Sequence, residues 1–150
     1  MRALYIFDID GTVANIEHRV HKLKEIDNPD RWDEFYSMCD KDVKNMPVIE
    51  TLNRILASGA EVYFFTGRVE AVRDKTEKWL LLNLYIGEVN LTMRPDGNYT
   101  PDHLLKDKWY NSMFDVDKKR LVAVFDDRQS VVDMWRSNNV ACFQVAPGNF

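Results

Sequence analysis

The apolar runs of this chain constrain its fold more than any other feature. Several are apolar at consecutive positions, as in Leu-Tyr-Ile-Phe and Val-Ala-Val-Phe, instead of alternating with polar residues. Such runs are typical of strands covered on both faces, and the stretches between them have helical periodicity. The sequence therefore predicts an α/β fold with a Rossmann-like, doubly wound parallel sheet of about five strands. The expected strands are Ala3–Asp8, Glu61–Thr66, Val89–Met93, Leu121–Asp126 and Val140–Val145.

Proline, glycine and asparagine indicate where the helices between these strands begin and end. Proline suits the first helical turn, because the N–H group that it lacks would have no partner there. Gly59 and Asn139 stand just before the second and fifth strands, where we expect a left-handed backbone at the end of a helix. The four expected helices start near Pro47, Val69, Pro101 and Gln129.

Residues 13–46 interrupt this alternation. They contain Ile16, Val20 and Leu23 at helical spacing, and then an aromatic stretch after Asp30, the expected N-cap of a second helix. We predict two short helices inserted at the carboxyl edge of the sheet, where ligands of open α/β sheets bind, so that the insertion can act as a lid. The alternative is that its aromatic side chains only extend the core, which we favour for most of them individually. The whole chain, 1–150, is expected to form one domain.

Charge and cysteine content narrow the class of protein. With 20 Lys and Arg against 24 Asp and Glu, the net charge is −4, which argues against a protein that coats a polyanion. An enzyme that touches only the end of a nucleic acid stays open. Cys39 and Cys142 lie in apolar sequence without metal-ligand spacing and are expected to be reduced core thiols of a cytoplasmic protein. No apolar run approaches the roughly 20 residues of a membrane span, so we expect no membrane association.

Aspartates follow two of the expected strands. Asp8 and Asp10 come at the end of the first strand, and Asp126 and Asp127 close the fourth. Alternate residues of an extended segment point the same way, so Asp8 and Asp10 are expected to face one pocket. Carboxylates gathered at one sheet edge repel one another unless a cation neutralises them, and such oxygen ligands suit Mg²⁺. An Asp-x-Asp motif alone is equally typical of a turn or cap; the second acidic pair favours a metal site.

A phosphate-binding site is predicted beside these acids. Thr66, Gly67 and Arg68 are expected to end the second strand and open the next helix, where free N–H groups and a guanidinium can bind an anion. Lys106 lies four residues after Asp102, and this spacing can hold its ammonium group in position. The alternatives are an ordinary strand-to-helix turn and a solvated surface ion pair.

These motifs together, DxDGT, TGR, Lys and DD, resemble those of the haloacid dehalogenase superfamily of phosphotransferases. The stretch from Phe125 to Arg136, with the end of the chain from Cys142 to Phe150, looks like the 3′-phosphatase domain of phage polynucleotide kinase-phosphatases. The resemblance spans nearly the whole chain and is weakest over the insertion.

The resemblance implies a role for each acidic residue. Asp8 would be the nucleophile that takes the phosphoryl group, and Asp10 the general acid and base. Mg²⁺ would be held by Asp8, the backbone carbonyl of Asp10 and Asp126, with Asp127 in or near the shell. Thr66 and Lys106 would bind the transferring oxygens.

The substrate implied is a phosphorylated nucleic-acid 3′ end or a nucleotide. An arginine eleven residues after the nucleophile, here Arg19, is typical of the polynucleotide-end phosphatases. Further positions that match functional or supporting residues there are Arg68, Arg94, Asp102 and Arg128.

The chain departs from that family in lacking a GxxxxGK[ST] loop, so it is expected to remove phosphate and not to add it, and separate kinase or ligase partners are conceivable. Three alternatives stay open: a small-molecule phosphatase of the same superfamily, a receiver-type signalling domain and an inactive binding module. In receiver-type domains the acidic motifs follow the strands in a different order from the one in this sequence. An inactive module would be expected to have lost Asp8, Asp10, Lys106 or the Asp126-Asp127 pair, and all of them are present. His18, His21 and His103 lack the spacing of a transition-metal site.

Overall fold

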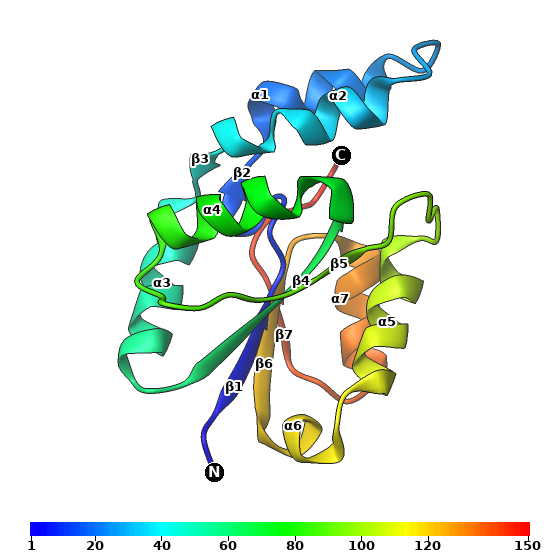
Figure 1. Cartoon of the computed structure of the whole chain (residues 1–150). Coiled ribbons are helices and arrows are strands. Elements are labelled where there is room, and N and C mark those ends of the chain that lie inside the picture. The colour runs from blue at the N-terminus through cyan, green and yellow to red at the C-terminus, as the bar shows by residue number, and fades with distance from the viewer.

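A parallel sheet forms the centre of the molecule, as the sequence predicts. The computed structural model describes residues 1–150, and its five strands lie in the order β5-β4-β1-β6-β7, with every neighbouring pair parallel. The carboxyl ends of all five strands therefore meet at one edge of the sheet (Figure 1). The strands are β1 (Leu4–Phe7), β4 (Glu61–Val69), β5 (Asn90–Arg94), β6 (Leu121–Asp126) and β7 (Cys142–Gln144).

The sheet is buried on both faces, which explains the continuous apolar runs. Ile6 and Phe65 pack into one core, and their neighbours Phe7 and Phe64 pack into the other. Because successive side chains of a strand point to opposite faces, a strand between two cores must be apolar at every position. The helices α3 (Met46–Ala57) and α4 (Arg73–Asn83) cover the face of Phe7 and Phe64, whereas α5 (Asp102–Ser112) and α7 (Gln129–Ser137) cover the other (Figure 1).

Three of the four predicted helix starts lie within one residue of the observed ones, and the fourth is displaced. Strand β4 continues to Val69, a 3₁₀ turn η3 (Glu70–Val72) follows, and α4 begins only at Arg73. The short helix α6 (Asp115–Arg120) was not predicted. Both expected left-handed residues are confirmed, since φ is +87° at Gly59 and +58° at Asn139.

The segment 13–46 contains more short elements than the two helices predicted. They are β2 (Ala14–Asn15), α1 (Glu17–Val20), η1 (His21–Lys24), α2 (Arg31–Ser37), η2 (Cys39–Lys41) and β3 (Val43–Lys44). Strands β2 and β3 pair antiparallel and form the base from which α1 and α2 project beyond the carboxyl edge of the sheet (Figure 1). Asp30 occupies the N-cap position of α2, but its side chain makes no capping hydrogen bond.

Both cysteines are free and buried, as expected. No helix of this chain has the length and apolar character needed to cross a membrane.

Candidate active site

Asp8 lies at the first residue beyond β1, where the backbone still pairs with the sheet. Its N–H group donates to the carbonyl of Phe125 at 2.9 Å, which fixes the main chain at this edge. The carboxylate is held at both oxygens: Lys106 Nζ donates to Oδ1 at 2.7 Å, and Thr12 Oγ1 donates to Oδ2 at 3.1 Å. The carboxylate of Asp8 is therefore buried and is oriented through both of its oxygens.

Lys106 links the ends of β1 and β6. It is buried in α5, and its ammonium group also donates to Asp126 Oδ2 at 2.8 Å. Burial alone would lower the pKa of Lys106, but the carboxylates of Asp126 and Asp8 outweigh it and raise the pKa above its ordinary value. The lysine therefore stays a cation beneath the site.

Three buried carboxylates gather here, and the ammonium group of Lys106 contacts two of them. Asp8, Asp126 and Asp127 each present an oxygen atom, and these oxygens all lie within 4.8 Å of one another. Burial, and then the charge of Asp126, raises the pKa of Asp8 well above its ordinary value and that of Asp127 to about 7. This excess of negative charge fits a divalent cation with oxygen ligands, so the residues present suit Mg²⁺.

The turn after Asp10 leaves room for this cluster. Gly11 has φ +82°, and a Cβ atom there would come within 2.2 Å of Asp127 Oδ2. Only glycine permits this backbone so close to the carboxylate.

The side chain of Asp10 does not join the carboxylate cluster, so only its backbone carbonyl stays a predicted metal ligand. Its Oδ1 accepts hydrogen bonds from Arg19 Nη2 at 2.7 Å and from Arg68 Nη2 at 2.7 Å and Nε at 2.9 Å. Burial opposes ionisation of Asp10, but the two guanidinium groups outweigh it and lower its pKa. Asp10 is thus an oriented carboxylate that lines the site.

A residue that sequence reasoning missed holds both arginines. Asp42 Oδ2 accepts from Arg19 Nη2 and from Arg68 Nη2, each at 2.7 Å, and its Oδ1 accepts from Arg19 Nε at 2.7 Å. His18 Nε2 lies 2.7 Å from the same Oδ1, and the Asp42 carbonyl accepts from Trp79 Nε1 at 2.9 Å. No motif marks Asp42, because only the β2–β3 pairing brings it beside these arginines.

We expect the Asp42→Asn variant to be strongly destabilised. Both arginine side chains are fully buried, and removing one of two carboxylates leaves uncompensated charge away from water. Breaking such a buried pair typically costs about 3–5 kcal/mol of unfolding free energy, to be measured by denaturant titration. The matched control Asp40→Asn removes a partly exposed acid, for which a change within about 0.5 kcal/mol is expected. An equally small loss for Asp42→Asn would contradict this role.

The structure differs from the prediction that Arg68 binds phosphate. Each side-chain nitrogen of Arg68 donates to a protein acceptor, with Nη1 bonded to Thr76 Oγ1 at 3.1 Å, and the residue is fully buried. Arg19 is buried in the same way. The predicted seat at a helix N-terminus is also absent, because β4 continues past Arg68 and the N–H group of Ala71 donates to Asp96 Oδ1 at 2.9 Å.

Thr66 and Gly67 end up in different surroundings. Thr66 is fully buried in β4, and its hydroxyl oxygen accepts the N–H group of Arg68 at 3.2 Å. Gly67 lines the cleft, and a Cβ atom there would lie 2.7 Å from Asp102 Oδ1. Its lack of a side chain makes room for that carboxylate.

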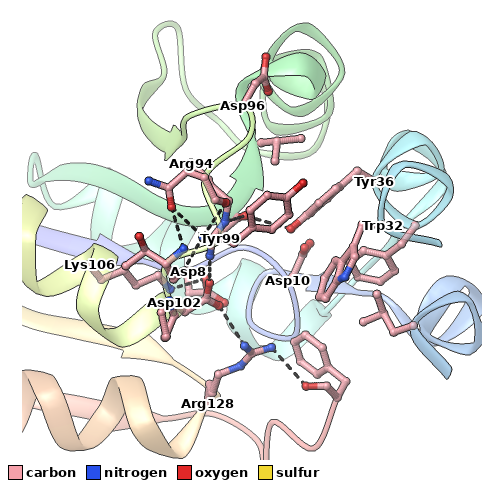
Figure 2. A pocket seen from close by; sticks show the side chains of 18 of the residues that line it. Asp8, Asp10, Trp32, Tyr36, Arg94, Asp96, Tyr99, Asp102, Lys106 and Arg128 are labelled. Carbon is pink, nitrogen blue, oxygen red and sulfur yellow. Dashed lines mark hydrogen bonds and ion pairs between the residues drawn. The ribbon is translucent and has the colours of Figure 1, made fainter. Parts of the chain in front are cut away.

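Asp102 does not orient Lys106, contrary to the i,i+4 pairing predicted. Its carboxylate is paired with Arg94, and its Oδ2 lies 3.1 Å from Arg128 Nη1. Figure 2 shows this group of three on the side of the cleft next to Lys106. Arg94 and Arg128, which the resemblance implies for substrate binding, both line the cleft, and each is already paired with a carboxylate.

The cleft opens from the carboxylates toward the insertion. It has a volume of about 430 Å³ and is lined by Asp8, Asp10 and Lys106 at its base. Trp32 and Tyr36 of α2 form one wall, and Tyr99 lies on the loop after β5 (Figure 2). A phosphate monoester has room to reach Asp8 with the rest of its molecule between these walls.

The parallel sheet, the carboxylate of Asp8 beside a buried lysine and the second acidic pair are the features of a phosphatase domain of the haloacid dehalogenase class. The family model described as "Polynucleotide kinase PNKP phosphatase domain" matches residues 2–150. The chain belongs to this family.

Known proteins agree with this assignment. A protein of Autographa californica nuclear polyhedrosis virus, named as a bifunctional polynucleotide kinase/RNA ligase, is 34% identical over 131 residues, covering 86% of this chain and 17% of its own length. A chain in the solved Pnkp1/Rnl/Hen1 RNA repair complex superposes with a TM-score of 0.80 at 30% identity, covering 100% of this chain and 44% of its own. The Class C acid phosphatase from Bacillus anthracis with tungstate bound shares the fold, with a TM-score of 0.65 at 13% identity, covering 100% of this chain and 69% of its own. The chain spans less than half the length of the first two relatives.

Proposed function

We propose that this protein removes the phosphate group from the 3′ end of a polynucleotide, with Mg²⁺ bound in the carboxylate cluster. The observation that carries the proposal is the placement of Asp8 at the base of an open cleft, with both of its carboxylate oxygens oriented. The family, and the RNA repair complex in which a similar chain occurs, support a nucleic-acid end as the substrate.

The first chemical step transfers the phosphoryl group to the protein. A carboxylate oxygen of Asp8 attacks phosphorus, the bond from phosphorus to the 3′ oxygen breaks, and Asp10 donates a proton to that leaving oxygen. Lys106, which lines the cleft beside Asp8, stabilises charge on the oxygens in transit. The products are an aspartyl-phosphate at Asp8 and a free 3′-hydroxyl.

The second step returns Asp8 to its starting state. Water attacks the phosphorus atom of the aspartyl-phosphate, Asp10 accepts a proton of that water, the bond from phosphorus to the Asp8 oxygen breaks, and inorganic phosphate leaves. Because Arg19 and Arg68 lower the pKa of Asp10, its carboxylate is ionised and can accept this proton. For the first step it must take up a proton, which the arrival of an anionic phosphate beside it favours.

The cation completes the charge balance of the site. Mg²⁺ would be held by Asp8, Asp126 and Asp127, with the backbone carbonyl of Asp10 as a further ligand, and when bound it screens the anionic nucleophile from the anionic substrate. The remaining ligands would be water molecules and oxygens of the substrate phosphate.

Since similar chains occur in an RNA repair complex and in a viral kinase/ligase polypeptide, we also propose that kinase and ligase activities act together with this domain. The phosphatase leaves a 3′-hydroxyl, which is the end that a ligase requires.

A panel of substrates tests this function. We expect phosphate release from a 3′-phosphorylated oligonucleotide to exceed that from a 5′-phosphorylated one and from a sugar phosphate by at least about tenfold in kcat/KM, the equivalent of about 1.4 kcal/mol. EDTA should abolish release from all of them, and added Mg²⁺ should restore it. Faster turnover of the sugar phosphate would assign the domain to small-molecule substrates instead, and activity that survives EDTA would contradict the role of the metal.

A further inference from the structure

The cleft is too acidic to bind a long phosphate backbone. Its lining contains seven carboxylates and only three cationic side chains, Arg94, Lys106 and Arg128. Each cation is already paired, because Lys106 contacts Asp8 and Asp126, whereas both arginines contact Asp102. Binding of a polyanion depends on cations that can neutralise its phosphates, and none of the three is free to do so.

Aromatic rings provide the remaining binding surface. Trp32 lies in α2 on one wall of the cleft and is 43% exposed, although it stacks on Tyr36 with ring centroids 5.9 Å apart. The hydroxyl of Tyr36 donates to the carbonyl of Gly67 at 3.2 Å, which ties this wall to the end of β4. Trp32 thus presents a ring that is held in place and still reaches solvent.

Tyr99 lies on the loop between β5 and α5 and is 89% exposed, so it contributes almost nothing to the core. The loop beneath it is fixed: Arg94 Nη1 donates to the carbonyls of Asn98 and Thr100, and the N–H group of Thr100 donates to Asn98 Oδ1 at 2.9 Å. Trp32, Tyr36 and Tyr99 line the same cleft, and Figure 2 shows Trp32 and Tyr36 together on α2, with Tyr99 across from them near Arg94.

We propose that Trp32 and Tyr99 form a stacking subsite for the base of an unpaired 3′-terminal nucleotide. The inference rests on the proposed function, because it places the phosphate of that nucleotide at Asp8. Base stacking needs no cation and tolerates every base, so it suits an acidic cleft that must accept any sequence. The domain then contacts the last nucleotide and few or none of the phosphodiesters before it.

The test compares two oligonucleotides that both end in a 3′-phosphate, one with a normal last nucleotide and one with an abasic sugar there. For the normal substrate, Trp32→Ala and Tyr99→Ala should each lower kcat/KM by roughly 5- to 150-fold, the effect of one stacked base. Trp32→Phe and Tyr99→Phe should keep most of the activity, since they retain a ring. On the abasic substrate, wild type and alanine variants should be equally slow.

Tyr85→Ala is the matched control, because Tyr85 is 88% exposed and does not line this cleft. It should leave both substrates unaffected. Equal losses of the Trp32 and Tyr99 variants on the normal and abasic substrates would overturn the stacking subsite and leave the phosphatase function intact. If the wild-type protein hydrolysed p-nitrophenyl phosphate but neither oligonucleotide, that result would overturn the proposed function itself.

Salt dependence gives a second measurement. A plot of log kcat/KM against log[KCl] should have a slope no steeper than about −1, because few phosphodiester contacts release counterions. A slope of about −3 or steeper would show that the backbone is bound and would contradict the proposal.

Discussion

We expect the Asp8→Asn variant to lose phosphatase turnover by roughly 10⁴-fold or more, the range in which removal of a nucleophile falls in other covalent enzymes. The amide has the shape of the carboxylate, but its oxygen is a far weaker nucleophile. The measurement is phosphate release from the 3′-phosphorylated oligonucleotide at saturating Mg²⁺. Activity within about tenfold of wild type would contradict the assignment of Asp8.

The Asp8→Asn variant should lose activity without losing stability. Because burial raises the pKa of Asp8, the folded state is favoured while the pH is below the unfolded-state pKa, and this advantage is lost as the pH rises through the raised folded-state pKa. At neutral pH, without metal, the raised pKa of Asp8 therefore costs stability, and Asp8→Asn removes that cost. In EDTA the free energy of unfolding of the variant should equal or exceed that of wild type.

Asp27→Asn is the control for both measurements, since Asp27 is exposed and makes no ion pair. It should change neither activity nor stability measurably. An Asp8→Asn variant that is inactive but also strongly destabilised would indicate loss of the site geometry instead of loss of the nucleophile.

The Asp10→Asn variant should lose steady-state turnover by about 10²- to 10⁴-fold, the contribution of a general acid–base group. The loss should depend on the step observed. p-Nitrophenolate is a good leaving group that needs no protonation, so the first step with p-nitrophenyl phosphate should proceed. We expect a rapid burst of about one equivalent of nitrophenolate, followed by slow release of phosphate, because an amide in place of the Asp10 carboxylate cannot take a proton from water.

Asp33→Asn provides the matched comparison, because Asp33 lines the same cleft but makes no hydrogen bond through its carboxylate. It should show normal turnover. Steady-state turnover of Asp10→Asn within about tenfold of wild type would contradict the acid–base role, and slow turnover without a burst would contradict the expectation that the first step with p-nitrophenyl phosphate proceeds without Asp10.

The fold could be predicted because it depends on local patterns. Ile6 and Phe7, or Phe64 and Phe65, are adjacent apolar residues that only a sheet covered on both faces can bury, so a parallel α/β architecture follows from consecutive positions. The displaced start of α4 could not be predicted from such patterns, because the continuation of β4 through Arg68 depends on pairing with β5.

The candidate site, like the fold, could be predicted only in part. Two of the residues, Asp8 and Asp126, could be selected because they stand at strand ends. Lys106 could be selected from its place on a helix before β6, and the structure brings the three together. The partners of the charged groups could not be selected. Asp102 lies four residues before Lys106 yet pairs with two arginines, since the fold places Arg94, at the end of β5, and Arg128 beside it.

By itself, the sequence determined the parallel sheet and the acids at its carboxyl edge, because both depend on the alternation of side chains along a strand. Only the tertiary structure decided that Arg19 and Arg68 hold Asp10, and that Asp42 holds them both. The physical reason is that a buried charge needs an opposite charge within a few ångströms, and such partners are chosen by chain crossings that no spacing along the sequence records.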